Sequence, residues 1–385
     1  MTINRERLAA TFTELCEISS PSRQERKIAD HIKQVFTKLG AASIYEDNSA
    51  DQTDSNAGNL IITFDGTNSS SEPILFACHM DTVTPADNVK VKREGDTFKS
   101  AGETILGADD KSGIAAIIEA VQLIKETDQS HNPLELVFTT CEEVGLLGAK
   151  HLEHAKLNAK YGYAIDSSTT DCAIIKAPAA NTFEIKVHGL AAHAGLSPER
   201  GINAFSVAAK AIAELKIGRL DEESTSNLGV IQGGIARNIV PDLVTIKGEV
   251  RSHSEEKLIA HTDKISQAFV DTVENWVNPA AENRGKPTVE IKVNREYNSL
   301  SLDENSKAIK QLKLVLENQK QQLKLTATGG GSDANVLIEY GIDVSILGSG
   351  MQQVHTVDEF IELDDMVGIT ELVYKLSTVN NSNSQ

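Results

Sequence analysis

The stretch ILFACHMD at residues 74–81 is an apolar run that ends in a histidine and an aspartate. The apolar residues 74–78 predict a buried strand. His79 and Asp81 are two residues apart at its end, so their side chains point to the same face. In sheets that carry helices on both faces, ligands bind at the carboxyl ends of the strands. The stretch therefore predicts an α/β sheet with polar side chains gathered at one edge.

Two later apolar runs end in acidic residues in the same way. Residues 134–139 form a predicted strand that Glu142 and Glu143 follow, and residues 163–165 form one that ends at Asp166. Adjacent carboxylates diverge, so one glutamate can bind a metal ion while the other remains a general base. The alternative for this pair is an exposed acidic turn before a helix. Repetition of the pattern at three strand ends favours a metal site.

Asp109 and His355 enlarge this set of metal-binding side chains. Asp109 lies in a glycine-bounded turn before a helix that begins near Lys111. Its carboxylate can bridge two metal ions, and that geometry predicts a strained, cis peptide bond after Asp109. The alternative is an aspartate that caps the helix. Carboxylate oxygen and imidazole nitrogen together suit a pair of Zn²⁺, Mn²⁺ or Co²⁺ ions. The sequence therefore predicts a dinuclear metallohydrolase.

The bulk properties of the chain limit its partners. Its 385 residues predict two domains. A formal net charge of −18 argues against nucleic acid or an anionic membrane as a partner. No stretch resembles a secretory signal or approaches membrane-spanning length, so we expect a cytoplasmic location. The four cysteines form no CxxC pair, so we expect free thiols rather than a disulfide framework.

The chain reads as one domain inserted into another. Residues 1–178 alternate between strands and helices, and this alternation resumes in residues 294–385. Between them, residues 179–293 follow the order strand, helix, strand, strand, helix, strand, which predicts a self-contained α+β domain. The simplest architecture is a catalytic α/β domain, 1–178 and 294–385, interrupted by the smaller domain.

Three local features of the first domain are also predicted. Ser22 and Glu25 match a capping box at the start of a helix that Gly40 ends. The polar residues 46–58 predict an exposed loop or a hairpin tip, and residues 146–154 predict a helix.

The motifs together resemble the M20 family of dinuclear zinc peptidases and amidohydrolases, and within it the tripeptidase T and peptidase T-like branch. The resemblance extends over nearly the whole chain and implies a catalytic domain with a mixed sheet flanked by helices, plus an inserted α+β lid and dimerisation domain. The matching stretches are HMDTV (79–83), GADDKSG (107–113), TCEEVG (140–145), ID (165–166), HGLAAHAG (188–195), GINA (201–204) and GMQQVHT (350–356).

The resemblance implies a role for each residue at the strand ends. Two divalent ions, zinc with manganese or cobalt as alternatives, would be bound by His79, Asp109, Glu143, Asp166 and His355. Asp109 would bridge the two ions. His79 and Asp166 would bind one ion, and Glu143 and His355 would bind the other. Asp81 would orient His79. Glu142 would be the general base: it would pass a proton from the metal-bridging water, which attacks the scissile carbonyl, to the leaving amine.

The resemblance also implies a contribution from the inserted domain and from a glycine-rich loop. His193 would stabilise the tetrahedral oxyanion of a neighbouring active site, in a homodimer formed through the lid. Asn238, Arg251, Gly330 and Asp333 resemble substrate-contacting positions. The alternatives are a solvated turn histidine at 193, a surface arginine at 251 and a helix-capping aspartate at 333.

The function implied is a metal-dependent aminopeptidase that releases the N-terminal residue from short peptides, as tripeptidases do. An M20-type carboxypeptidase or N-acyl-amino-acid deacylase keeps the same chemistry on another substrate. A metal-binding protein without catalysis is disfavoured because every position of the site holds a competent residue. A nucleotide-binding α/β protein is disfavoured because no phosphate-binding fingerprint is present.

Overall fold

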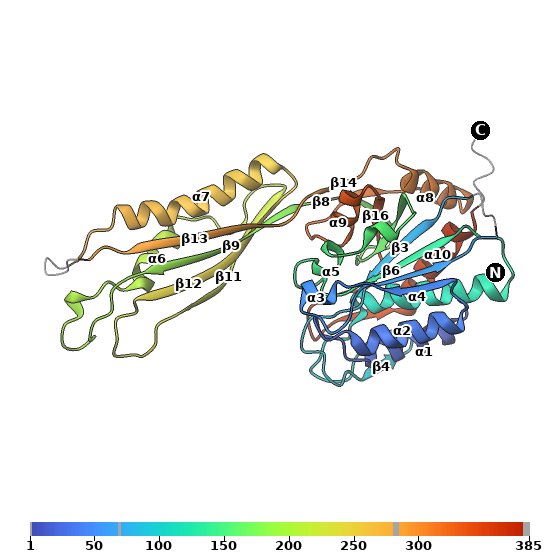
Figure 1. The fold of residues 1–385 in the computed structure, drawn as a ribbon, viewed down its shortest axis with the longest axis horizontal. Coiled ribbons are helices and arrows are strands. Elements are labelled where there is room, and N and C mark those ends of the chain that lie inside the picture. The colour runs from blue at the N-terminus through green and yellow to red at the C-terminus, as the bar shows by residue number, and fades with distance from the viewer. Residues whose placement is uncertain (1, 68–70, 280–284, 380–385) are drawn as a thin grey trace. The chain divides into compact units, whose positions relative to one another are not determined.

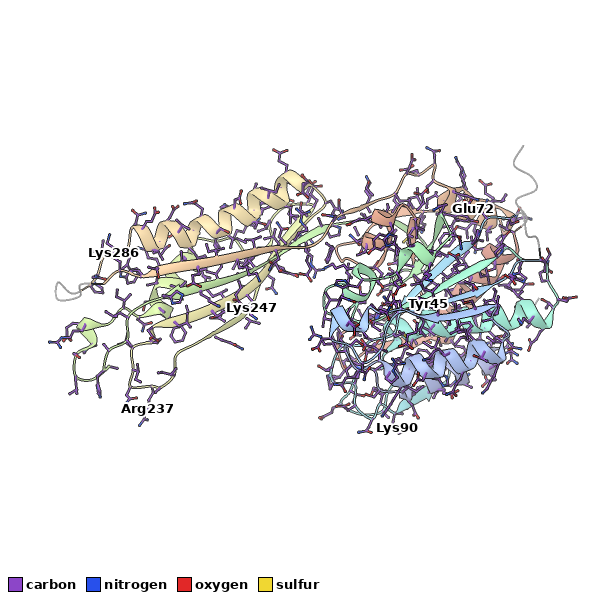
Figure 2. The ribbon with its side chains drawn as sticks, in the orientation of Figure 1. Tyr45, Glu72, Lys90, Arg237, Lys247 and Lys286 are labelled. Carbon is purple, nitrogen blue, oxygen red and sulfur yellow. The ribbon has the colours of Figure 1, made fainter. Side chains whose placement is uncertain are left out.

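The computed structural model describes residues 2–67, 71–279 and 285–379. It consists of two compact units, coloured along the chain in Figure 1. Unit 1 comprises Met1–Lys176, Leu300–Thr328 and Ser332–Gln385, and unit 2 comprises Ala177–Ser299 and Gly329–Gly331. Charged side chains such as Lys90 in unit 1 and Lys247 in unit 2 lie on the outside of each unit (Figure 2).

Unit 1 is built on a mixed sheet in the order β1-β2-β6-β3-β7-β16-β8-β14, with β15 added beside β8. The four strands β6, β3, β7 and β16 run parallel to one another. The strands are β1 Ser43–Glu46, β2 Leu60–Phe64, β3 Ile74–His79, β6 Leu134–Thr139, β7 Tyr161–Ile165, β8 Ala173–Ala177, β14 Leu300–Ser301, β15 Leu325–Ala327 and β16 Asp343–Leu347. The central strands consist mainly of apolar residues because both of their faces are buried.

Helices flank this sheet and close the core of unit 1. Phe36 of α2 packs against Phe64 of β2 and Phe138 of β6, and the Tyr163 hydroxyl of β7 donates to the Ala308 carbonyl of α8. The longer helices are α1 Arg5–Glu17, α2 Arg26–Lys38, α4 Ala108–Glu126, α8 Lys307–Asn318 and α10 Leu363–Thr378. The short elements are α3 Ala50–Thr53, α5 Leu147–Lys150, α9 Ala334–Leu337, η1 His154–Lys156, η3 Ile338–Tyr340 and a small sheet of β4 Val91–Glu94, β5 Thr97–Ser100 and β17 Phe360–Glu362.

Unit 2 is an antiparallel sheet in the order β10-β11-β12-β9-β13, against which α6 and α7 pack. Buried and partly exposed residues alternate along β9, as expected for a strand with one covered face. The elements are β9 Ala179–His188, η2 Pro198–Arg200, α6 Ala204–Ala213, β10 Gly218–Arg219, β11 Ser224–Gly233, β12 Leu243–Ser252, α7 Glu255–Glu274 and β13 Thr288–Tyr297.

The mixed sheet flanked by helices confirms the predicted fold class. The stretch 46–58 joins the antiparallel strands β1 and β2, which confirms the predicted hairpin tip. Asp47 within it is buried and accepts the backbone N–H groups of Ser49 and Asn59. Two local predictions are wrong. The helix expected over 146–154 is only α5, followed by the 3₁₀-helix η1. Ser22 and Glu25 form no capping box: Glu25 makes no side-chain cap hydrogen bond with the helix it precedes.

Among the described residues, no helix is long and apolar enough to cross a membrane.

Candidate metal centre

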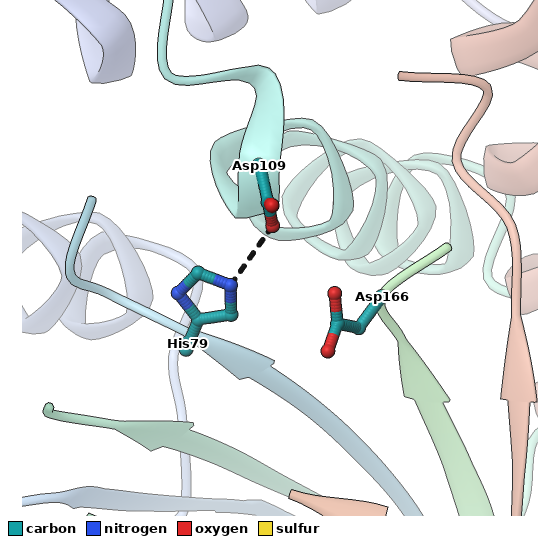
Figure 3. Close-up of side chains that lie close together, drawn as sticks. All are labelled: His79, Asp109 and Asp166. Atoms are coloured by element: carbon teal, nitrogen blue, oxygen red, sulfur yellow. Dashed lines mark hydrogen bonds and ion pairs between the residues drawn. The ribbon is translucent and has the colours of Figure 1, made fainter. Parts of the chain in front are cut away.

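Segments far apart in the sequence meet at the carboxyl ends of the parallel strands of unit 1. His79 is the last residue of β3, Asp166 directly follows β7, and the two glutamates follow β6. Asp109 lies in the first turn of α4, and His355 lies in the loop between β16 and β17. Figure 3 shows His79, Asp109 and Asp166 turned toward one another. The structure therefore brings together the five residues to which metal binding was assigned from the sequence.

Local backbone geometry sets the position of Asp109. Helix α4 approaches the sheet at Gly113, where an added Cβ would lie 2.7 Å from the Cys78 sulfur and 3.0 Å from the Ile165 carbonyl. Asp109 and Asp110 have non-helical backbone angles within α4. The peptide bond between them is cis, which confirms the sequence prediction.

Asp109 lies between the two histidines of the site. Its Oδ1 is 2.9 Å from His79 Nε2, and its Oδ2 is 3.2 Å from His355 Nε2. His355 Nε2 is also 2.9 Å from Glu143 Oε1. Three groups of possible ligand atoms, each within 4.8 Å, overlap here: His79–Asp109–Asp166, His79–Glu142–Glu143 and Asp109–Glu143–His355. The shared aspartate links the first group to the third.

The hydrogen bonds of His79 indicate that a proton or a cation lies between this ring and the carboxylate of Asp109. His79 Nδ1 donates to the Asp81 backbone carbonyl at 2.9 Å, which leaves a lone pair on Nε2. That lone pair faces a carboxylate oxygen, so an acceptor faces an acceptor unless a proton or a cation lies between them. Within the described part of the chain, Glu142 and Asp166 form no ion pair with lysine or arginine. A donor set of nitrogen and carboxylate oxygen fits divalent cations.

The pKa shifts at this site reflect the same uncompensated charge. Burial lowers the pKa of His79, but the hydrogen bond to Asp109 and the nearby Asp81 carboxylate outweigh burial and hold this pKa well above its usual value. Hydrogen bonds to Asp109 and Glu143 raise the pKa of His355 to about 10. Burial and the charge of Asp109 raise the pKa of Asp166 to about 8.

Burial also raises the pKa of Glu142 well above its usual value, and the charges of Asp166 and Asp333 add to this effect. Bound cations would supply the missing positive charge and favour the ionised carboxylates.

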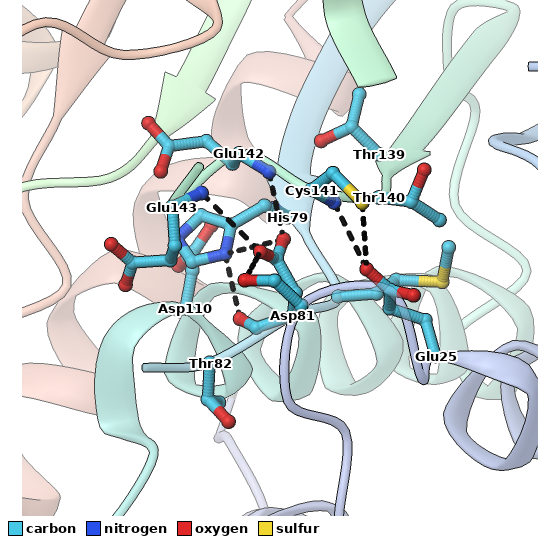
Figure 4. A network of polar contacts seen from close by, with 12 residues as sticks. Glu25, His79, Asp81, Thr82, Asp110, Thr139, Thr140, Cys141, Glu142 and Glu143 are labelled. Atoms are coloured by element: carbon cyan, nitrogen blue, oxygen red, sulfur yellow. Dashed lines mark hydrogen bonds and ion pairs between the residues drawn. The ribbon is translucent and has the colours of Figure 1, made fainter. Parts of the chain in front are cut away.

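Asp81 contacts His79 differently from the sequence prediction. The His79 ring is oriented by the Asp81 backbone carbonyl, and the Asp81 carboxylate lies 3.6 Å from Nδ1. This carboxylate instead accepts the Glu142 N–H at 2.9 Å and the Glu143 N–H at 3.3 Å (Figure 4). It also accepts the Ser22 hydroxyl at 2.6 Å. Asp81 thus joins the end of β3 to the turn that carries both glutamates.

Asp333 contacts Thr139, the last residue of β6 before the turn that carries the two glutamates. Gly330, the other candidate of the glycine-rich loop, belongs to unit 2. Asp333 is the N-cap residue of α9, yet its side chain makes no capping hydrogen bond. One of its carboxylate oxygens accepts the Thr139 hydroxyl, and the other is buried without a hydrogen-bond partner among the described residues. Burial raises the pKa of Asp333 to about 6.

His193, Asn238 and Arg251 all lie in unit 2. His193 is exposed, and its Nδ1 accepts the backbone N–H groups of Gly195 and Leu196 at 3.2 Å each. The proton of the neutral ring is therefore on Nε2. The Asn238 carbonyl accepts the Ala194 N–H, so the loops that carry Asn238 and His193 are joined. The Arg251 guanidinium forms two hydrogen bonds to the carboxylate of Glu249, both 3.0 Å long.

Two buried glutamates at the centre were not identified from the sequence as site residues. Glu25 accepts the Cys141 N–H, and Glu359 accepts the N–H groups of Leu106, Gly107 and Asp109. The pattern at Glu25 had been assigned to a helix cap. Glu359 follows His355 by four residues, and nothing local distinguishes it from a surface glutamate.

Known proteins match the chain along most of its length. The family model described as peptidase family M20/M25/M40 matches residues 75–378. A solved aminopeptidase PepT from Bacillus cereus ATCC 10987 is 36% identical, with a TM-score of 0.83 and 98% of each chain covered. A solved tripeptidase from Staphylococcus aureus subsp. aureus Mu50 is 34% identical, with a TM-score of 0.88 over 98% of this chain and 99% of the other. The uncharacterized protein YqjE of Bacillus subtilis (strain 168) is 38% identical over 372 residues, 96% of this chain and 97% of the relative.

Proposed function

Because this chain belongs to peptidase family M20/M25/M40, we propose that it is a metal-dependent aminopeptidase that releases the N-terminal residue from short peptides. The similarity to a solved aminopeptidase and a solved tripeptidase supports this substrate class. The observation that carries the proposal is the position of Asp109, whose two oxygens face the imidazole nitrogens of His79 and His355. A carboxylate placed in this way is suited to bridge two cations.

The proposed cofactor is a pair of divalent ions, zinc first and manganese or cobalt as alternatives. His79, Asp109 and Asp166 would hold one ion, and Asp109, Glu143 and His355 the other. When bound, the ions would supply Lewis-acid polarisation of the scissile carbonyl and lower the pKa of a water molecule.

Glu142 is the proposed general base. One of its carboxylate oxygens lies within 4.8 Å of ligand atoms of His79 and Glu143. Glu142 would accept a proton from the attacking water and deliver it to the nitrogen of the leaving amine as the C–N bond breaks. The pocket of Glu142 is suited to both steps, because burial favours its protonated form and bound cations favour its charged form.

The proposed substrate contacts follow the resemblance to the family. The Nε2–H of His193 is available to donate to the oxyanion, since Nδ1 is occupied as an acceptor. Asp333 has a buried oxygen without a hydrogen-bond partner in the described structure and is our candidate for binding the substrate ammonium group, beside the glycine-rich loop at Gly330. Asn238 and Arg251 are proposed to bind the far end of the peptide. Arg251 must exchange its contact with Glu249 for a substrate carboxylate.

We expect the metal-loaded protein to cleave Ala-Ala-Ala and to leave N-acetyl-Ala-Ala-Ala and N-acetylmethionine intact, because aminopeptidase action requires a free amine. Products are measured by amino-acid analysis with time. In the same panel, Arg251→Ala is expected to raise KM for Ala-Ala-Ala about 10-fold and leave KM for its C-terminal amide unchanged, since a charge-assisted bond contributes about 1.5 kcal/mol.

Cleavage of the acylated compounds in place of Ala-Ala-Ala would assign the site to the carboxypeptidase or deacylase alternative. An equal rise of KM for the peptide and its amide would remove the carboxylate contact of Arg251.

The proposed homodimer would form through the sheet of unit 2. Strand β10 pairs only with Thr225 and Ser226 of β11, so the outer edge of β11 beyond Ser226 has no strand partner among the described residues. Val230 and Ile231 on this strand are exposed by 40% and 52%. An open apolar edge favours pairing with its own copy about a two-fold axis.

We expect light scattering to give a dimeric mass for the wild type, and Ile231→Lys to shift it toward the monomer with loss of peptidase activity. A wild-type monomer with full activity at the assay concentration would contradict the dimer.

A further inference from the structure

Two buried glutamates outside the ligand set hold the loops on which the ligand residues lie. Building on the proposed function, we propose that Glu25 and Glu359 are positioning residues that fix the general base and the bridging aspartate by accepting backbone N–H groups. Glu25 is 0% exposed and Glu359 is 1% exposed, and neither belongs to a group of possible metal ligands.

Glu25 acts on the turn that follows β6. Its Oε1 accepts the backbone N–H of Cys141 at 3.0 Å (Figure 4). The same oxygen accepts the Arg23 N–H at 2.9 Å, and Oε2 accepts the Ser55 hydroxyl at 2.6 Å. Cys141 has a φ of +54°, a conformation that residues with a Cβ rarely adopt. Such a backbone persists when its surroundings over-determine it. Glu25 supplies one of those constraints, immediately before Glu142.

Glu25 and Asp81 together bind three successive amides. Glu25 accepts from Cys141, and the Asp81 carboxylate accepts from Glu142 and Glu143. Both acceptors are fully buried, so water does not compete for these N–H groups. The direction in which the Glu142 side chain leaves the turn is therefore set by two carboxylates that do not touch the substrate.

Glu359 acts in the same way on the turn before α4. Its Oε2 accepts the N–H groups of Leu106 at 2.8 Å and Gly107 at 2.7 Å, and its Oε1 accepts the N–H of Asp109 at 3.0 Å. Glu359 is on the same loop as His355, so it joins that loop to the backbone of Asp109, and these two residues would hold one proposed metal ion. A shift of this carboxylate would change the distance between the two ligands.

The two glutamates differ in how they tolerate glutamine. At Glu25 the amide oxygen can keep the Arg23 and Cys141 N–H groups, while the NH₂ group faces the Ser55 hydroxyl, which can turn to accept. At Glu359 both oxygens accept backbone N–H groups. In either orientation of a glutamine side chain, its NH₂ group would therefore face a backbone N–H that needs an acceptor. Glu25→Gln should therefore be tolerated, whereas Glu25→Ala and Glu359→Gln should not.

Glu135 offers a matched control. It is 3% exposed and lies near the start of β6, at the end of the strand away from the metal centre. Its two oxygens accept the backbone N–H groups of Asn158 and Ala159. Glu135→Gln removes the same kind of buried acceptor as Glu359→Gln but touches no loop that carries a ligand. It separates a general loss of stability from a loss of positioning.

The experiment compares these four variants with the wild type as full-length, metal-loaded protein. It measures kcat and KM for Ala-Ala-Ala, the melting temperature, the affinity for Co²⁺ by titration and the Co²⁺ d–d absorption spectrum. We expect Glu25→Ala and Glu359→Gln to lower kcat about 10- to 100-fold, with KM within about twofold, which is the usual effect of removing a group that orients a ligand. Glu359→Gln should also weaken Co²⁺ binding and alter the spectrum, whereas Glu25→Gln should restore kcat and Glu135→Gln should lower only the melting temperature.

Wild-type kcat and an unchanged Co²⁺ spectrum in both Glu25→Ala and Glu359→Gln would overturn the proposal, as would an equal fall of kcat in Glu135→Gln. A wild type that binds Co²⁺ but cleaves no tripeptide would remove the proposed function alone. The Co²⁺ affinity and spectrum of Glu359→Gln would then decide the positioning role without any activity measurement.

Discussion

Glu142→Gln is expected to lower kcat for Ala-Ala-Ala by about 10²- to 10⁴-fold, the contribution of a well-placed general base. The substitution preserves the size of the side chain and the backbone N–H that Asp81 accepts at 2.9 Å, so the turn should stay in place. It removes only the ability to take and return a proton. Metal content and KM should therefore remain close to those of the wild type, and the measurement is steady-state kinetics beside metal analysis by mass spectrometry.

An exposed carboxylate provides the control for Glu142. Glu94 lies on β4 with a side chain that is 53% exposed, and Glu94→Gln should leave kcat unchanged. Retention of wild-type kcat by Glu142→Gln would assign proton transfer to another group. A loss of bound metal in the same variant would instead make Glu142 a ligand, a role open to it because its carboxylate is grouped with those of His79 and Glu143.

Strand ends could be predicted because their signal is local. An apolar run such as 134–139 buries both faces, and its abrupt end in acidic residues marks the edge of the sheet. Parallel strands bring such edges together, so the sequence alone predicts that His79 and Asp166 are neighbours. The position of His355 could not be obtained in this way, because it lies on a loop and depends on the return of the C-terminal segment to unit 1.

The supporting contacts of the site could not be predicted because tertiary partners override local patterns. Ser22 and Glu25 have the spacing of a capping box. Instead, the Ser22 hydroxyl donates to the Asp81 carboxylate, and the Glu25 carboxylate accepts a buried N–H of the turn after β6. A helix N-terminus on the surface can be satisfied by water, whereas a buried N–H has no such substitute. Ser22 and Glu25 therefore form hydrogen bonds with buried polar groups and do not cap the helix.

Asp109→Asn is expected to reduce the metal content from two ions per chain toward one and to abolish peptidase activity. Both Asp109 oxygens are used, one 2.9 Å from His79 Nε2 and the other 3.2 Å from His355 Nε2. An asparagine side chain has one acceptor and one donor group, so it can serve only one side of the site. Loss of several kcal/mol of Lewis-acid stabilisation of the transition state would lower kcat by at least about 10³-fold.

The control for Asp109→Asn is a buried carboxylate on the same helix. Glu119 of α4 has a side chain that is 1% exposed and lies 2.6 Å from Arg7 Nε, so Glu119→Gln should lower stability and leave two ions bound. If Asp109→Asn retained two ions and wild-type kcat, the bridging role would be wrong, and the two imidazoles would have to face separate carboxylates. A single tightly bound ion with residual activity would place the reaction on one metal, with Asp109 serving to organise the second.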